Sequence, residues 1–300
     1  MILIAGGTGT LGTRVVRLLT ARGLPVRILT RDPARAQHLE SELVEVVPGD
    51  VRDLASVQRT MEGTQTVISA IHGFQGPGNV RPRTVDFEGN SNLIRAARGA
   101  GSDHVILISI HGAAPNSAME LFRMKFLAQR ELRASGLAWT IVRPTALMET
   151  WAKVVGEPLL KCGKTRIFGR GRNPINFVSA DDVARFVELA VVDPAMRGVS
   201  LDVGGPENLS MRRFVEVFQD VTGQSGSVGH VPLPMMRALS VVLRPVNPAL
   251  ARVIQAGVVM DTRDMSFDPT DLLRRYPSIP LTPLAEFVRR SVVGPVPAVP

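Results

Sequence analysis

The chain has 300 residues, of which 45% are hydrophobic and 21% charged, so it can bury a large core and is neither a disordered nor a fibrous protein. Its formal net charge of +8 comes almost entirely from arginine, and because no Lys/Arg-rich run of five or more occurs, we expect no nucleic-acid partner. The single cysteine, Cys162, excludes an internal disulfide and a multi-cysteine metal site, so we expect no metal and a reducing compartment.

The N-terminal residues, MILIAGG, pass directly from an apolar run into a glycine motif and lack the charged n-region of a signal peptide. They are predicted to form a first strand. No apolar run reaches the roughly 18 residues that a membrane helix needs, so we expect a cytoplasmic protein without a membrane span.

The first half of the chain alternates short apolar runs with longer amphipathic ones, which is the pattern of repeated β-α units. Strands are expected at residues 2–5, 26–30, 43–47, 66–70, 105–110 and 139–142. Helices are expected at residues 11–21, 33–40, 54–61, 85–98 and 117–134. Because parallel strands need right-handed crossovers, this order predicts one doubly wound parallel α/β sheet.

Beyond Pro144 the composition changes to shorter elements separated by proline and glycine. The boundary predicts a first domain at 1–145 and a smaller, partly helical region at 146–300, from which segments such as 175–205 return to the first domain. Further elements are expected at 175–178, 181–191 (capped by Ser179), 199–203 and 210–222, with two amphipathic helices within 231–260 and a tail without regular structure at 292–300.

The segment GGTGTLG at residues 6–12 follows a predicted strand immediately and opens a helix. Gly7 permits a tight turn, Gly9 lets the backbone approach a pyrophosphate, and Gly12 lets helix and strand pack closely. The N–H groups and dipole of the following helix attract phosphate. A purely structural turn is the alternative, but this context predicts a dinucleotide-binding turn formed by Gly6, Gly7, Thr8, Gly9, Thr10, Leu11 and Gly12.

The end of the second strand indicates which nicotinamide cofactor is bound. Thr30 stands where an acidic residue would bind a free ribose 2′-hydroxyl. Arg31 can pair with a 2′-phosphate, with Arg35 as a second contact, which favours NADP(H) over NAD(H). Two alternatives remain: Asp32 serves as the acid and NAD is bound, or Arg31 is an ordinary surface arginine.

Ligands of open α/β sheets lie beyond the carboxyl ends of the strands. We therefore expect Asp50 and Val51, after the third strand, at the adenine, and Ala70 and Ile71, after the fourth, at the ribose and pyrophosphate. His72 overhangs the same edge and is interpreted as a loop residue.

In combination these motifs resemble the extended and atypical short-chain dehydrogenase/reductases, particularly the NmrA-like branch. The resemblance covers most of residues 1–205, is loose over 206–300, and is carried by GGTGTLG at 6–12, LTRDP at 29–33, GDVRD at 49–53, DFEGNSNLIRAA at 86–97, HVILIS at 104–109, RP at 143–144 and NPINFVSADDVARF at 173–186. It implies a Rossmann-type sheet that binds NAD(P), a cofactor contact at Pro144, and a smaller C-terminal substrate-binding domain.

The resemblance also assigns catalytic positions. The superfamily uses a Tyr-x-x-x-Lys pair on the helix after the fifth strand and a serine at that strand's end. Ser109 and Lys125 match the serine and the lysine and are the candidate catalytic residues, but Leu121 occupies the tyrosine position. Because the single tyrosine, Tyr276, lies far along the chain, the usual proton donor is missing.

Helical geometry singles out Lys125 independently. At about 100° per residue, it shares the apolar face of its helix with Phe122 and Ala128. An unpaired ammonium there would be costly, so Lys125 either extends to solvent or finds a partner such as a ribose hydroxyl, which we favour.

The sequence therefore predicts an NADPH-dependent reductase of a quinone, enone or carbonyl compound. The substrate is expected to be small and apolar, with candidate contacts from His111, Leu121, Met148 and Trp151. His111 is equally well explained as a structural residue, and a homodimer is compatible with the sequence. The alternatives are a non-catalytic NADP(H)-binding sensor or accessory protein and, less favoured, an enzyme of non-redox rearrangement.

Overall fold

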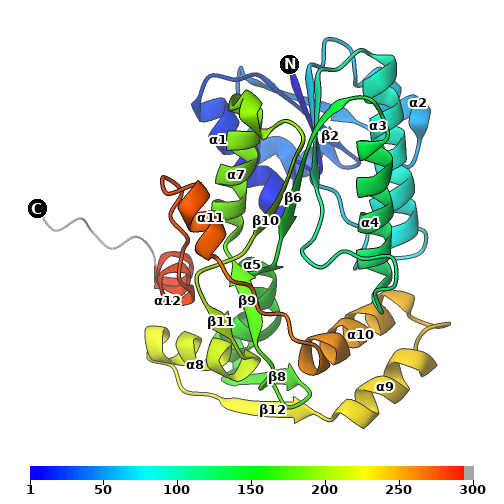
Figure 1. Ribbon diagram of the computed structural model, residues 1–300. Coiled ribbons are helices and arrows are strands. Elements are labelled where there is room, and N and C mark those ends of the chain that lie inside the picture. The colour runs from blue at the N-terminus through cyan, green and yellow to red at the C-terminus, as the bar shows by residue number, and fades with distance from the viewer. Residues whose placement is uncertain (294–300) are drawn as a thin grey trace, which may run out of the picture. The chain divides into compact units, whose positions relative to one another are not determined.

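The computed structural model describes residues 1–293 (Figure 1). These residues form two units. The first consists of Met1–Pro144 and Val183–Asp202, and the second of Thr145–Asp182 and the described residues from Val203 onward. Among the described residues, no helix combines the length and the apolar composition that crossing a membrane requires.

A seven-stranded sheet forms the centre of the first unit, in the order β10-β6-β5-β4-β1-β2-β3. The strands are β1 (Ile2–Ala5), β2 (Val26–Thr30), β3 (Val44–Pro48), β4 (Thr66–Ser69), β5 (His104–Ile108), β6 (Ala138–Pro144) and β10 (Val199–Val203). β1 pairs in parallel with both β2 and β4, with Ile2 opposite Val26 and Thr66. The order of the strands reverses between β1 and β4, so this is the doubly wound parallel sheet that the sequence predicts.

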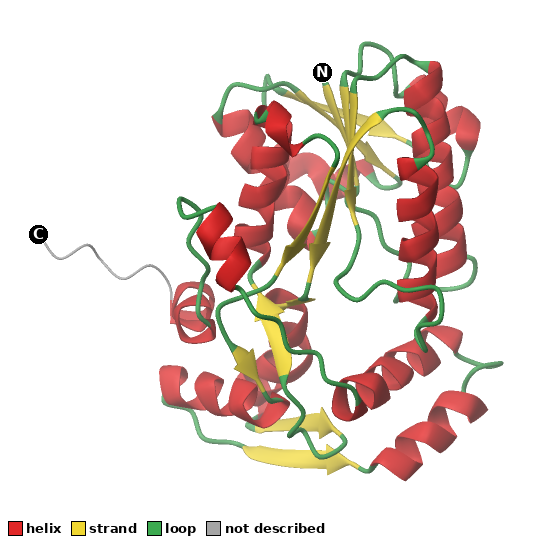
Figure 2. Cartoon of the chain, in the orientation of Figure 1, coloured by secondary structure: helices red, strands yellow, loops and turns green. Residues whose placement is uncertain are grey.

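Helices cover both faces of this sheet, with α1 and α7 on one side and α3 and α4 on the other (Figures 1 and 2). The helical elements are α1 (Thr10–Ala21), η1 (Pro33–Leu39), α2 (Leu54–Arg59), η2 (Arg83–Gly89), α3 (Asn90–Gly99), α4 (Glu120–Arg133), α7 (Ala180–Val192) and η4 (Pro194–Met196). Alternate strand residues such as Leu3, Val67 and Leu107 pack against Leu93 and Leu132 of α3 and α4. Burial of this apolar layer stabilises the sheet and fixes the positions of its strand ends.

Two predicted helices begin differently from expectation. The helix expected from residue 85 opens as the π-helix η2, in which the Asp86 side chain points inward and accepts a hydrogen bond from Gly73 N at 2.8 Å. The helix expected from residue 117 begins at Glu120, because the Ser117 hydroxyl accepts from Met119 N at 3.3 Å and closes a turn first.

The second unit contains two small sheets. β9 (Ile175–Val178) pairs antiparallel with β11 (Asn208–Leu209) and parallel with β7 (Ala146–Leu147), and β8 (Lys164–Phe168) pairs in parallel with β12 (Ser227–Val231). Its helical elements are α5 (Met148–Trp151), η3 (Ala152–Gly156), α6 (Glu157–Cys162), α8 (Met211–Thr222), α9 (Leu233–Val242), α10 (Pro248–Thr262), α11 (Thr270–Arg275), α12 (Leu284–Val288) and η5 (Arg289–Val293).

Aromatic side chains fill the core of the second unit. Phe214 lies between Phe177 and Phe218, with ring centroids at 4.7 and 5.4 Å. The two helices predicted within 231–260 are α9 and α10. The tail expected to lack regular structure begins within η5 at Val292, and its residues 294–300 lie outside the described residues.

Candidate functional site

The turn at residues 6–12 is closed by glycines that no other residue can replace without movement. Gly6 has a φ of +88°, a conformation that L-residues rarely adopt. Its carbonyl accepts a hydrogen bond from Gly9 N at 3.0 Å. A Cβ at Gly12 would lie 2.1 Å from Gly6 O, so the helix and the turn pack backbone against backbone.

Gly9 differs from its neighbours because it faces open space. A Cβ there would meet only Gly6 O, at 3.2 Å, within a radius of 4 Å. Gly9 is also the N-cap of α1, and among residues 1–293 no side chain caps this helix. The first N–H groups of α1 and the positive end of its dipole therefore lie beside a residue that adds no side chain of its own, as the close approach of a pyrophosphate requires.

Two arginines lie on the surface after β2. Arg31 and Arg35 are exposed, whereas Thr30 is buried and its hydroxyl accepts from Asp32 N at 3.2 Å. The Asp32 carboxylate caps η1 by accepting from Ala34 N at 3.2 Å. This local hydrogen bond competes with the role of ribose acceptor that was the alternative for Asp32.

The loops that follow β3 and β4 both approach η2, although β1 and β2 separate the two strands in the sheet. A Cβ at Gly89 would meet Val51 Cγ2 at 2.9 Å and Ile71 Cδ1 at 3.4 Å, so η2 packs directly on both residues. Arg52 Nη2 lies 2.5 Å from Asp50 Oδ2, and this hydrogen bond, with a smaller effect of the Arg31 charge, holds the pKa of Asp50 below its ordinary value. An open groove of about 530 Å³ adjoins this edge, lined by Asp50, Arg52, Asp53, Asn79, Arg81, Thr84 and Glu88.

Lys125 has partners that the sequence did not reveal. Its Nζ donates to Ile71 O at 2.8 Å and to Ile108 O at 2.9 Å, and it lies 3.0 Å from Asp86 Oδ1. Lys125 is 4% exposed and Asp86 0%. The ammonium neither extends to solvent nor needs a ribose hydroxyl as its partner, and a ribose contact would require it to give up one of these three neighbours.

Ser109 is likewise buried, and its hydroxyl accepts a hydrogen bond from Gln129 Nε2 at 2.6 Å. Behind Lys125, the Ser69 hydroxyl donates to Asn90 Oδ1 at 2.6 Å, and Asn90 Nδ2 donates to Asp86 O at 2.7 Å. Leu121 is half-buried on the same helix as Lys125. The matched serine and lysine are thus part of a packed polar layer beneath the strand ends.

A second polar cluster joins the ends of β5, β6 and β10. His111 Nδ1 lies 2.9 Å from Asp202 Oδ1, and Arg143 Nη2 lies 2.7 Å from Asp202 Oδ2. His111 N donates to the carbonyl of Pro144 at 2.9 Å. Burial alone would raise the pKa of the Asp202 carboxyl, but the hydrogen bond from His111 and the charge of Arg143 outweigh it and hold that pKa below its ordinary value.

The remaining predicted substrate contacts belong to the second unit. Met148 is part of its buried core, and its substrate contact stays a prediction. Trp151 packs edge-to-face against Phe168, with ring centroids at 6.5 Å.

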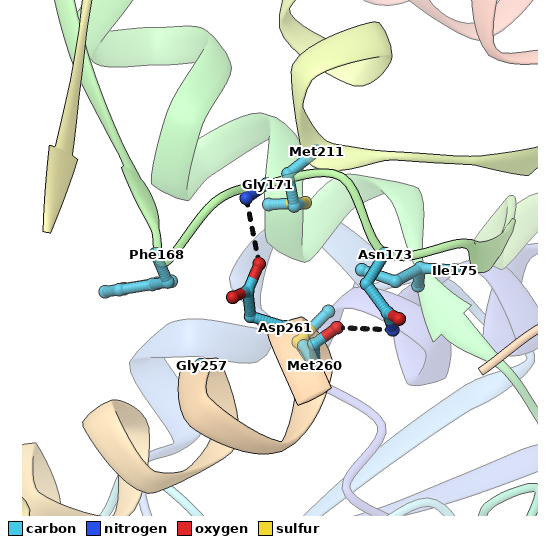
Figure 3. A pocket seen from close by; sticks show the side chains of 8 residues that line it. All are labelled: Phe168, Gly171, Asn173, Ile175, Met211, Gly257, Met260 and Asp261. Atoms are coloured by element: carbon cyan, nitrogen blue, oxygen red, sulfur yellow. Dashed lines mark hydrogen bonds between the residues drawn. The ribbon is translucent and has the colours of Figure 1, made fainter. Parts of the chain in front are cut away.

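The second unit also holds a small pocket, beside the C-terminal end of α10 (Figure 3). Its volume of about 10 Å³ is enough for a single water molecule. Asp261 Oδ1 accepts from Gly171 N at 2.8 Å, and Asn173 Nδ2 donates to Met260 O at 2.8 Å (Figure 3). These contacts fix the loop between β8 and β9 on α10, and the pocket is too small for an organic substrate.

Comparison with known proteins gives a consistent result. Residues 6–194 match a family model described as NAD(P)H-binding. The NAD(P)H azoreductase of Xenophilus azovorans is 31% identical over 211 residues, which is 70% of each chain. The photosystem II assembly factor Ycf39 of Synechocystis is 27% identical over 237 residues, 79% of this chain and 72% of that protein.

Among solved structures, the NADPH-dependent quinone oxidoreductase QOR2 of Escherichia coli, complexed with NADPH, superposes with a TM-score of 0.77 at 20% identity. The match covers 97% of this chain and 99% of that one. At this level of identity the likeness establishes a shared fold.

Proposed function

This chain belongs to the NAD(P)H-binding family of the atypical short-chain dehydrogenase/reductases, and we propose that it is an NADPH-dependent reductase of quinones, enones or related conjugated acceptors. The proposal rests on the two positions where the wider superfamily has its catalytic tyrosine and lysine. Leu121 stands at the tyrosine position, and Lys125 is engaged with Asp86 and two carbonyls. Conjugated acceptors delocalise the charge that develops on reduction, so they need less assistance from such a pair.

The residues that would hold the cofactor follow from the site. The turn at 6–12 and the N-terminus of α1 would bind the pyrophosphate, Arg31 and Arg35 the 2′-phosphate, and Val51 and Ile71 would line the nucleotide. When bound, NADPH supplies a hydride to the acceptor.

The direct test is oxidation of NADPH by the purified protein, followed at the nicotinamide absorbance band. We expect turnover with quinones and enones and much slower turnover with simple ketones. Tight NADPH binding without turnover of any acceptor would instead support a sensor or accessory protein, the alternative that the resemblance to the assembly factor Ycf39 favours.

Cofactor preference is tested by Arg31→Ala. Loss of a charge-assisted hydrogen bond costs about 1.5–3 kcal/mol, so the Kd for NADPH should rise about 10- to 150-fold while the Kd for NADH stays within twofold. Fluorescence titration of both cofactors measures the difference. Arg98→Ala, which removes another exposed arginine from the last turn of α3, is the matched control and should change neither Kd. An equal loss for both cofactors would assign Arg31 a role other than 2′-phosphate binding.

A further inference from the structure

Three side chains from three different strand ends meet at the edge of the sheet where ligands of this fold class lie. His111 follows β5, Arg143 is on β6 and Asp202 is on β10. The contacts from Asp202 Oδ1 to His111 Nδ1 and from Oδ2 to Arg143 Nη2 measure 2.9 and 2.7 Å. The side chains are partly exposed, at 36% for His111, 30% for Asp202 and 28% for Arg143.

We propose that His111 is the proton donor that replaces the missing tyrosine, and that Asp202 and Arg143 are its positioning residues. This inference rests on the proposed reductase function. The other residues matched to the catalytic positions are poorly suited to the task, because Ser109 is 5% exposed and bonded to Gln129, and Lys125 is enclosed by its three acceptors.

The carboxylate determines which imidazole nitrogen delivers the proton. Asp202 accepts the Nδ1 proton of His111 and stabilises the imidazolium, which directs the exchangeable proton to Nε2. Arg143 binds the other carboxylate oxygen, so Asp202 stays ionised and cannot rotate away. Burial, together with the charge of Arg143, lowers the pKa of the Arg133 guanidinium, so a second guanidinium group lies beside the Arg143–Asp202 pair.

A quinone that has accepted a hydride, which is one proton and two electrons, carries a negative charge on oxygen. The Nε2–H bond of the His111 imidazolium breaks and an O–H bond forms on that oxygen, which gives the hydroquinone. The neutral imidazole, still protonated on Nδ1, then recovers a proton from water, so each turnover consumes one NADPH and one proton.

The test compares His111→Gln, which retains a donor toward Asp202, with His111→Ala. General acid catalysis contributes about 10²–10⁴-fold, and a quinone needs less assistance than a ketone, so kcat for quinone reduction should fall by about 100-fold, the lower end of that range, in both variants. KM and the Kd for NADPH should stay within twofold, and added imidazole should restore part of the rate of His111→Ala. His38→Ala is the matched control, because His38 is an exposed histidine of η1 outside this cluster, and its kcat should not change.

A second acceptor separates proton donation from hydride transfer. A cationic triarylmethane dye takes up a hydride at carbon and needs no proton, so its reduction should be unaffected by either His111 substitution. If the quinone rate is unchanged in the His111 variants, or if both acceptors lose rate equally, the assignment of His111 is overturned while the reductase function stands. A wild-type protein that turns over no acceptor overturns both proposals.

The positioning role has a readout in the free protein. Nitrogen NMR should show His111 with its proton on Nδ1, and Asp202→Asn should abolish this signature and lower kcat by about 10-fold without changing KM. The double variant His111→Ala/Asp202→Asn should be no slower than His111→Ala, because a positioning residue has no effect without the residue that it positions. Additive losses, or an unchanged nitrogen signature, would overturn the role of Asp202.

Discussion

Replacing Lys125 with methionine is expected to lower the free energy of unfolding by about 3–5 kcal/mol, the cost of breaking a buried ion pair by removing one partner. The substitution keeps the length of the side chain but leaves Asp86, which is 0% exposed, as an uncompensated buried carboxylate. It also removes the donor that connects Ile71 O, after β4, with Ile108 O, at the end of β5. Urea denaturation followed by circular dichroism measures the change.

Two further variants identify the cause of this loss. Adding Asp86→Asn to Lys125→Met removes the stranded charge and should recover part of the stability. Lys153→Met makes the same change at an exposed position and should be nearly neutral. If Lys125→Met is as stable as the parent and instead fails to bind NADPH, the ammonium reaches the cofactor ribose and the pair with Asp86 is not maintained in solution.

Gly9→Val is expected to weaken binding of NADPH and NADH alike by at least about 100-fold, the equivalent of one or two charge-assisted hydrogen bonds. The valine side chain would occupy the space in front of α1 where the pyrophosphate must approach the backbone. The fold should persist, because a Cβ at Gly9 meets only Gly6 O within 4 Å and the φ of −84° is ordinary for any residue. Fluorescence titration and a thermal melt measure the two properties separately.

Gly99→Val is the control for this change, because a Cβ at Gly99, the last residue of α3, meets nothing within 4 Å and lies away from the turn. Its affinity for both cofactors should match that of the parent. A folded Gly9→Val variant with unchanged affinity would show that the nucleotide binds elsewhere.

Two strands, β1 and β2, have the predicted bounds, because Gly6 follows the first and Arg31 the second. β5 is a longer apolar run and spans His104–Ile108 instead of the predicted 105–110, because no glycine, proline or charged residue marks its end. In the second unit, β7 and β11 are two residues long and exist only through their register with β9. β8 and β12 pair only with each other among the described strands, and exposed positions interrupt both, so neither has an apolar run that marks it as a strand in the sequence.

The same contrast between local and distant information applies to the site. The glycine turn is encoded in seven consecutive residues, so its form could be read directly from the sequence. The apolar face of α4 indicated that Lys125 needs a partner, but Asp86 belongs to another helix and is brought there by the packing of η2. Asp202 is 91 residues from His111, and only the pairing of β10 beside β6 brings the two together.

The position of β10 also determines the order in which the first unit can be completed. The chain leaves this unit at Pro144, forms Thr145–Asp182 of the second, and returns with Val183–Asp202. During synthesis, β6 therefore emerges as an edge strand with unpaired backbone groups, and it keeps that edge until β10 has been made. A fragment ending at residue 144 would retain the glycine turn and the Lys125–Asp86 pair, but it would present an open edge to other chains and would lack the carboxylate that holds His111.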